Sequence, residues 1–371
     1  MLIKRQGTPN DAETSLGKTA FHTAIRNGLP EVAKLLWSAG ADVDLIDNEG
    51  MTPIQEAGWQ ILTRTNSQAH RDALQSMFDT TMWSEALELS LLHKAVVNLL
   101  PGVNLEEFIR VHKSLLNVQD ATLRTPLHWA AETADENALD ALLVHHADTS
   151  IRDCFGDTPL MKAVKKGSMN CIKKLLVARA DPTVTNNLRE TTLHLASRHS
   201  VEMIDLLRSM GVPFSPSIQN LTPLDWAAIT NNVEVGRHLI SLGVDVNFPD
   251  GRGHTTIFHA TICWGQEFAR MLLGLPQLDL SVLNHDGETV LHVLARHGDI
   301  RGACAFLDAE IHGLDPDVVS SKGETASEVF EVRLMPPVGF DAIFQRLVVK
   351  LRDNFHSRSI MEDIFFYTKE K

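Results

Sequence analysis

Histidine is the residue type in this chain that most readily suggests chemistry, since the sequence holds 17 of them. Imidazole binds metals and transfers protons near neutral pH. His259 and Cys263 lie four residues apart on a predicted helix, so they share one face and could hold a metal or form a thiolate–imidazole pair. A structural zinc needs four ligands and a nucleophile needs an oriented base, and the neighbouring Thr256 and Ile262 supply neither. We therefore favour ordinary packing for this pair.

Other signals of enzymatic chemistry are missing from the sequence. The cysteines are Cys154, Cys171, Cys263 and Cys304, and they form no CxxC pair, which suits a reducing compartment. The chain also has no P-loop, GxSxG, HExxH or Gly-rich dinucleotide phrase. The sequence favours a non-enzymatic protein, and we expect no metal and no cofactor.

The net charge limits the partners that the chain can bind. Lys and Arg number 34 against 47 Asp and Glu, a formal charge of −13 with no cationic block. A field of this sign repels phosphate backbones, so we expect no nucleic-acid partner. The opening residues carry no apolar signal region, and no apolar run reaches the roughly 18 residues of a bilayer span. We expect a cytoplasmic or nuclear protein without a membrane partner.

The chain is built from a phrase that recurs with a nearly fixed period. It runs from Thr to an Ala five residues later, and its clear copies start at Thr125, Thr158, Thr191, Thr222 and Thr255, with spacings of 33, 33, 31 and 33 residues. Looser copies start at Thr19, Thr52, Ser90, Thr289 and Thr325. A fixed period near 33 indicates one supersecondary unit repeated about ten times.

One repeat, residues 120–150, shows how the sequence folds locally. Thr125 is a good helix N-cap, and Pro126 occupies the first helical position. Two apolar faces at helical spacing follow, at Leu127, Ala130 and Ala131, and then at Ala138, Leu139, Leu142 and Leu143. The repeat therefore predicts two short antiparallel helices and a projecting turn. Neither helix can bury its apolar face alone, so neighbouring repeats must stack.

These residues resemble the ankyrin repeat family, whose signature is Thr-Pro-Leu-His-x-Ala followed by a Gly-Ala-Asp turn. The resemblance is strongest from Thr125 to Asp245 and implies an all-α solenoid of helix-turn-helix repeats with short β-hairpin-like turns. We expect an N-terminal extension over residues 1–16, repeats over 17–330, and a capping helix and tail over 331–371. The resemblance also implies a structural role for five motif histidines, which tie each turn to its neighbour: His22, His93, His128, His194 and His292.

Three segments depart from the pattern. The second repeat runs long between Trp59 and Glu88, and we favour a lengthened second helix there over a segment that reshapes one edge. The third repeat carries Pro101 and Gly102 between its helices. Near the C-terminus, apolar residues at Ile343, Leu347, Val348 and Leu351 predict a helix that covers the last core face or, alternatively, binds a partner.

The resemblance implies that a partner protein contacts the turn tips and the ends of the first helices. The residues that we expect there are Trp59, Glu132, Phe155, Lys165, Lys166, Arg189, Arg198, His199 and Arg252. Because Lys165, Lys166, Arg189 and Arg198 follow one another in an otherwise acidic chain, they predict a positive groove for an acidic peptide or protein face. A solvated run of charges is an equal alternative.

A small-molecule or catalytic groove in the sixth to eighth repeats is the alternative to a protein-binding adaptor. Its polar and aromatic residues would be Asp225, Trp226, His254, His259 and Trp264. Packing between first helices explains Trp129 and Trp226 more simply than ligand stacking does. A closed pocket with convergent polar groups would support this alternative. The sequence predicts neither the partner's identity nor the oligomeric state.

Overall fold

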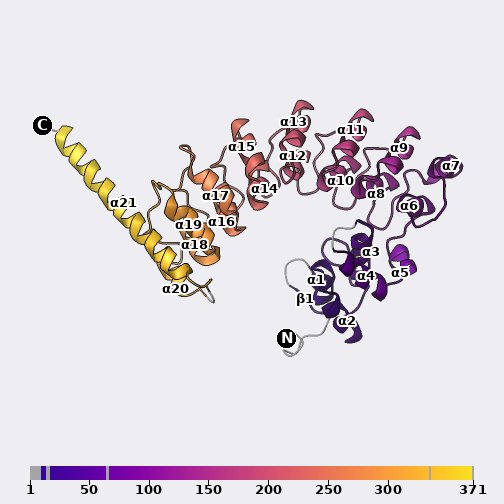
Figure 1. Ribbon diagram of the computed structural model, residues 1–371, viewed down its shortest axis with the longest axis horizontal. Helices are drawn as coiled ribbons and strands as arrows, with labels where there is room; N and C mark the ends of the chain where they lie inside the picture. The colour runs from indigo at the N-terminus through magenta and orange to yellow at the C-terminus, as the bar shows by residue number, and fades with distance from the viewer. Residues whose placement is uncertain (1–9, 14–16, 64–66, 334–335, 370–371) are drawn as a thin grey trace. The chain divides into compact units, whose positions relative to one another are not determined.

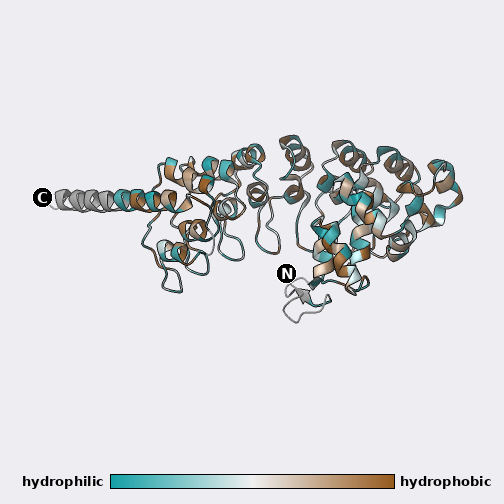
Figure 2. Ribbon diagram, turned by 60° about the horizontal axis from the view of Figure 1, so that its bottom comes forward, coloured by the Kyte–Doolittle hydropathy of each residue, from teal (hydrophilic) through white to brown (hydrophobic). Residues whose placement is uncertain are grey.

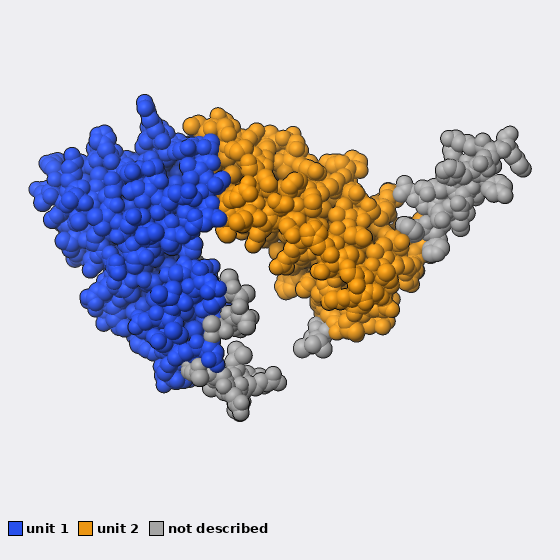
Figure 3. Space-filling view, turned by 180° about the vertical axis from the view of Figure 1, so that it is seen from behind, with its two compact units in different colours: residues 1–187 blue, residues 188–371 orange. Residues whose placement is uncertain are grey.

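The computed structural model describes residues 10–13, 17–63, 67–333 and 336–369, with the side chains of residues 12, 13 and 355–369 left aside. Contacts between Cα atoms divide the chain into two compact units, Met1–Asn187 and Leu188–Lys371 (Figure 3). Both units consist of stacked helix pairs, so the predicted all-α solenoid of ankyrin-type repeats is confirmed (Figure 1). No helix in the described part of the chain has both the length and the apolar character needed to cross a bilayer.

Each repeat contributes a first helix that begins with the recurring Thr or Ser phrase. In unit 1 these first helices are α1 (Ala20–Arg26), α3 (Pro53–Thr63), α6 (Leu91–Val96), α8 (Pro126–Thr133) and α10 (Pro159–Lys166). In unit 2 they are α12 (Thr192–Ala196), α14 (Pro223–Ile229), α16 (Thr256–Ile262), α18 (Val290–His297) and α20 (Ala326–Glu331).

A second helix follows each first helix along the chain. In unit 1 these are α2 (Pro30–Ser38), α4 (Gln68–Met77), α7 (Leu105–Val111), α9 (Glu136–Val144) and α11 (Met169–Val177). In unit 2 they are α13 (Val201–Ser209), α15 (Val233–Ser241), α17 (Gln266–Leu273), α19 (Ile300–Asp308) and α21 (Phe340–Lys369). Two further helical segments are α5 (Thr80–Ala86) and the 3₁₀ turn η2 (Lys113–Leu115).

The core lies between the stacked helices. Leu127, Ala130 and Ala131 of α8 are fully buried, as are Leu139 and Leu142 of α9. Small residues on the first helices let neighbouring repeats approach closely, so α8 packs on α10 and α14 on α16. Each helix carries both apolar and polar residues, which alternate in brown and teal along the ribbons (Figure 2).

Strand pairing in the described residues is short. β1 (Ala12–Glu13) pairs antiparallel with β2 (Lys18–Thr19), with Ala12 opposite Thr19, and Val319 forms an isolated bridge with Thr325. The turns between repeats are closed by backbone hydrogen bonds instead. In one of them the Asp153 N–H donates to Asp157 O at 2.9 Å, and the Cys154 N–H donates to Thr122 O of the preceding turn at 3.0 Å. Each turn is therefore tied to its neighbour.

The insertion in the second repeat does not lengthen the second helix, so that expectation was wrong. The first helix α3 runs to Thr63, the second helix α4 ends at Met77, and Thr80–Ala86 form the separate helix α5. The break falls at Phe78, whose backbone is extended, and the Asp79 carboxylate then caps α5 by accepting from the Met82 N–H at 2.9 Å. Trp83 of α5 is buried against α3.

The last helix, α21, packs against α19. Its buried residues are Phe340, Phe344, Leu347, Val348 and Leu351, whereas Ile343 is only half-buried. The Phe344 ring lies 5.1 Å from the Phe330 ring of α20, so this stripe closes over the last first helix as well. The proposed boundaries at residues 16 and 330 stay predictions.

Candidate partner-binding surface and its charge network

The motif histidines join consecutive repeats through hydrogen bonds. The Thr125 N–H donates to His128 Nδ1 at 3.1 Å, which leaves the proton on Nε2, and Nε2–H donates to Asp157 O of the next repeat at 3.1 Å. Equivalent bonds reach the next repeat from His22, His93, His194 and His292. The structural role predicted for these five residues is confirmed. Burial lowers the pKa of His128 and of His194 to about 4.

Asp225 takes the place of the motif histidine in the seventh repeat. The Thr222 N–H and hydroxyl donate to its Oδ2 at 2.7 and 2.9 Å, and the Thr256 hydroxyl donates to Oδ1 at 2.6 Å. The side chain is fully buried, and this burial raises the pKa of its carboxyl. Asp225 was expected in a ligand pocket; the structure places it inside the helix cap, where both carboxylate oxygens are occupied.

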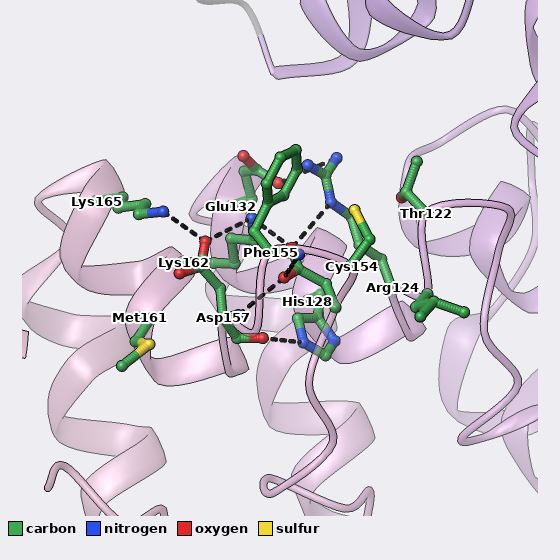
Figure 4. A network of polar contacts seen from close by, with 12 residues as sticks. Thr122, Arg124, His128, Glu132, Cys154, Phe155, Asp157, Met161, Lys162 and Lys165 are labelled. Atoms are coloured by element: carbon green, nitrogen blue, oxygen red, sulfur yellow. Dashed lines mark hydrogen bonds and ion pairs between the residues drawn. The ribbon is translucent and has the colours of Figure 1, made fainter. Parts of the chain in front are cut away.

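Unit 1 contains a buried network of charged side chains between the fourth and fifth repeats (Figure 4). Lys162 Nζ lies 2.7 Å from Asp153 Oδ2 and 3.0 Å from Asp157 Oδ2. Arg124 bridges Asp153 and Glu132 at 3.6 and 3.5 Å. Lys162 and Arg124 are only 3% exposed, so these charges depend on one another rather than on water.

The network sets the protonation of its members. Burial raises the pKa of Asp157, but the charges of Lys162 and Lys165 outweigh it and hold that pKa at about 2. Burial also raises the pKa of the Glu132 carboxyl, but the charges of Arg124 and Lys162 outweigh it, so that this pKa is lowered as well. Both carboxylates are therefore ionised at neutral pH.

The C-terminal end of α3 lies against the first helices of the fourth and fifth repeats. The Trp59 indole N–H donates to Glu132 Oε1 at 3.0 Å, and Lys166 Nζ donates to Thr63 O at 3.1 Å. Beside this contact is a cavity of about 280 Å³, lined by Leu62, Thr63, Val96, Val97, Asn98, Thr133, Asp135 and Lys166. Part of the surface that we expected to face a partner therefore faces α3 of the same chain.

The positive charge expected from unit 1 is largely compensated. Lys165 Nζ lies 2.5 Å from Asp157 Oδ2, and Lys166 bonds to the α3 backbone. Phe155 is half-buried, with Lys162 Nζ 5.5 Å from its ring centroid. The structure thus brings Trp59, Glu132, Lys165 and Lys166 into internal contacts, because buried carboxylates and a folded-over helix lie beside them. The sequence had suggested a free cationic surface.

In unit 2 the predicted cationic residues are exposed. Arg189 and Arg252 lie on turns, and neither forms an ion pair with a residue that the structure describes. Arg198 places its guanidinium 4.8 Å from the ring centroid of Trp226, so the tryptophan packs beneath a cation. His199 is half-buried, and its carbonyl accepts from Asn232 Nδ2 at 3.0 Å.

His254 and His259 gather around Asp250 in the eighth repeat. His259 Nε2 lies 3.2 Å from Asp250 Oδ2, and His254 Nδ1 lies 3.7 Å from the same oxygen. Burial raises the pKa of Asp250, but the hydrogen bond from His259 and two backbone N–H groups lower it to about 2. His259 is thus engaged with a carboxylate. Cys263 is an exposed residue, but it is covered enough by its neighbours that partial burial raises the pKa of the Cys263 thiol.

Trp264 lies apart from these histidines, at the end of α16. Its side chain is 62% exposed, and its indole N–H donates to His297 O at 3.0 Å. It borders a cavity of about 580 Å³ whose other lining residues are Arg296, His297, Lys322, Glu324, Val329, Val332 and Arg333. The five residues of the predicted small-molecule groove therefore have different contacts: Asp225 lies in a helix cap, Trp226 beneath Arg198, His254 and His259 around Asp250, and Trp264 at this cavity. Asp225 and His259 nevertheless interact, since the charge of His259 opposes the effect of burial on the pKa of the Asp225 carboxyl.

Two groups of residues were missed by the sequence reasoning. Lys162 occupies the position before the motif alanine, where the fourth repeat has Trp129 and the sixth has Leu195. A cation at an apolar position of the pattern must be paired when it is buried, and this signal could have located the network. Arg296, Lys322 and Arg333 lie at first-helix ends and turns of the last repeats.

The geometry on these repeats is that of a helical repeat solenoid with exposed turn tips and first-helix ends. Residues 88–186 and 160–250 match the family of ankyrin repeats in three copies, and residues 16–48 match the single ankyrin repeat. Together these matches cover more than half of the sequence, and the chain belongs to the ankyrin repeat family. Ankyrin repeats form protein–protein interaction domains, so binding of another protein is the general function that this membership assigns.

Similar proteins share only parts of the chain. Palmitoyltransferase AKR1 of Lachancea kluyveri is 33% identical over 110 residues, which are 29% of this chain and 15% of that protein. Neurogenic locus notch homolog protein 1 of Xenopus laevis is 31% identical over 134 residues, 34% of this chain and 5% of that protein. The chain thus spans a small fraction of these relatives.

A solved structure shows the same fold. The human ASB11 ankyrin repeat domain aligns with a TM-score of 0.52 and 19% identity, covering 60% of this chain and 98% of that domain.

Proposed function

We propose that this chain is a non-enzymatic adaptor that binds a partner protein through first-helix ends and turn tips. One observation carries the proposal. The recurring polar residues, such as His128 and His194, form hydrogen bonds between repeats. The side chains of Arg189, Arg198 and Arg252, in contrast, are exposed. Residues that join one repeat to the next cannot distinguish partners, but exposed residues that differ from repeat to repeat can. A cytoplasmic or nuclear location fits this role.

The exposed arginines of unit 2 favour an acidic partner surface. Arg189, Arg198 and Arg252 are cationic in a chain with a formal charge of −13, and an acidic surface would be attracted to them locally. In unit 1, Lys165 and Lys166 already have partners within the chain, so they are weaker candidates. We therefore place the main contact on unit 2, with His199 of the same unit as a secondary candidate.

The geometry favours an adaptor over a small-molecule groove in the sixth to eighth repeats. Asp225 has both oxygens bonded inside the helix cap, and His254 and His259 share Asp250. These carboxylates and histidines therefore already have partners within the chain, which counts against a ligand site, whereas the Trp226 indole N–H is buried without a hydrogen-bond partner among the described residues.

Affinity purification from native cells, read by mass spectrometry, tests this proposal. The baits are the wild-type chain, the variant Arg189→Glu/Arg252→Glu, and the control Arg237→Glu/Arg301→Glu, whose exposed arginines lie on the second helices α15 and α19. We expect a protein that the wild type and the control retain and the turn variant loses. Equal retention by all three would place the contact elsewhere, and no retained protein with any bait would contradict the adaptor role.

A further inference from the structure

The cavity of about 580 Å³ in unit 2 lies where the first helices of the last three repeats end. Trp264 follows α16, Arg296 and His297 close α18, and Arg333 follows α20 (Figure 1). Successive first helices pack side by side here, α16 on α18 and α18 on α20. The cavity is therefore built by three repeats together.

Cationic side chains dominate the polar lining of this cavity. Arg296, Lys322 and Arg333 face it with Glu324 as the acidic lining residue. Arg296 is paired with Glu288, but Lys322 and Arg333 form no ion pair with any residue that the structure describes. Arg333 does donate one N–H to Ala295 O at 3.1 Å, which leaves further guanidinium donors available.

The lowered pKa of His297, which also lines the cavity, agrees with a positive local potential. The pKa of His297 is lowered first by burial and then by the charges of Arg296 and Arg333. The cations around the cavity therefore disfavour a further positive charge there and favour an anionic ligand.

Trp264 is an unusual residue for its backbone position. Its φ is +57°, in the left-handed region, at the place where other repeats have Gly28, Gly167 or Asn231 with φ of +69°, +79° and +54°. Helices commonly end there with Gly or Asn, and a bulky residue costs about 1–2 kcal/mol. The indole is nevertheless 62% exposed rather than buried as compensation. Strain combined with an exposed aromatic side chain marks a binding position.

We propose that this cavity binds an acidic peptide segment of the partner protein that carries an apolar side chain next to its carboxylates. The carboxylates pair with Lys322 and Arg333, and the apolar side chain packs on Trp264 and on Val332, which is 70% exposed. A small inorganic anion would use the cations but leave the indole and the valine uncovered. This inference rests on the proposed adaptor function and locates its anchoring site.

Selection of a phage-displayed library of short random peptides on the full chain tests the site. Enriched peptides are labelled, and their affinity is measured by fluorescence anisotropy. We expect enrichment of Asp or Glu beside an apolar residue, and a loss of affinity of about tenfold or more in both Lys322→Glu and Trp264→Asn. The affinity for the wild type should also fall with added salt.

The variants are chosen so that loss of binding is separable from loss of folding. Asn occupies the equivalent left-handed position at Asn231, so Trp264→Asn should keep the thermal unfolding midpoint of the wild type. Arg301→Glu on α19 is the charge-reversal control and should bind normally.

Basic peptides, no enriched peptide, or affinities unchanged in both variants would overturn the proposed site. Displacement of the peptide by inorganic pyrophosphate with no effect of Trp264→Asn would show an anion site instead and would also overturn it. The adaptor function is tested independently, since a native partner lost with Arg189→Glu/Arg252→Glu would support it even if this cavity bound no peptide.

Discussion

The indole N–H of Trp59 donates a hydrogen bond of 3.0 Å to the carboxylate of Glu132, although 73 residues separate them in the chain. The bond joins α3 of the second repeat to α8 of the fourth. Glu132 is at the same time 3.5 Å from Arg124, so the indole extends the buried charge network to α3. A first helix in unit 1 therefore contacts a repeat that is not its neighbour in the stack.

The Trp59–Glu132 bond should contribute measurably to stability. Trp59→Phe keeps an aromatic ring but removes the N–H together with the five-membered ring, and we expect a loss of about 1–2 kcal/mol in the free energy of unfolding, because the acceptor is charged. A double-mutant cycle with Glu132→Ala, which removes the acceptor, isolates the pair when measured by urea denaturation. Additive effects of the two substitutions would contradict the bond.

Lys162 and Lys165 should differ strongly when their charges are removed. Lys162→Met leaves Asp153 and Asp157 buried with fewer partners, and we expect a loss of about 3–5 kcal/mol. Lys165 is 34% exposed and contacts Asp157 from the rim, so Lys165→Met should cost less than about 1 kcal/mol. Urea denaturation of both variants checks the difference, and similar losses would show that the network is not a buried one.

Acid should destabilise the protein through its motif histidines. His128 and His194 have pKa values of about 4 in the folded state against 6.5 when unfolded, so the unfolded state binds protons first. Their stabilising contribution is complete above pH 6.5 and is lost as the pH falls towards 4, by about 3 kcal/mol for each residue.

Urea denaturation at a series of pH values measures this slope. His128→Gln should be less stable at neutral pH but should lose less stability between pH 6.5 and 4 than the wild type does. The exposed His312 provides the control, since His312→Gln should leave the slope unchanged. A wild-type stability that did not change over this range would exclude the explanation.

Two glycines at the same position of their turns should respond differently to alanine. Gly50 and Gly156 have φ of +79° and +77°, so both substitutions carry a backbone cost of about 1–2 kcal/mol. A Cβ on Gly50 meets open space, whereas on Gly156 it would lie 2.8 Å from the backbone N of Asn187. We expect Gly156→Ala to cost about 1–3 kcal/mol more, as measured by thermal unfolding. Equal losses of stability would contradict the prediction, because they would mean that the neighbours of Gly156 shift to make room for the added Cβ.

The sequence predicted the repeats well because their signals are local. Thr125 and Pro126 define a helix start without help from distant residues, and the histidine phrase predicts the bond from His128 to the next turn. The insertion was harder to interpret. The mixed polar and apolar residues between Trp59 and Glu88 fit one long helix or several short ones. Helix α4 ends just before Phe78, where an extended residue precedes the cap Asp79 of the next helix.

The candidate site was predicted less well, since exposure and pairing are not local properties. The sequence by itself determined that Lys165 and Lys166 end a first helix, as α10 shows, but tertiary structure decided that Asp157 and α3 contact them. Likewise, Trp264 was recognised from sequence, whereas its cavity with Lys322 and Arg333 needed three stacked repeats. The physical reason is that repeat period and helix caps act within a few residues, while burial and charge pairing depend on side chains that only folding brings together.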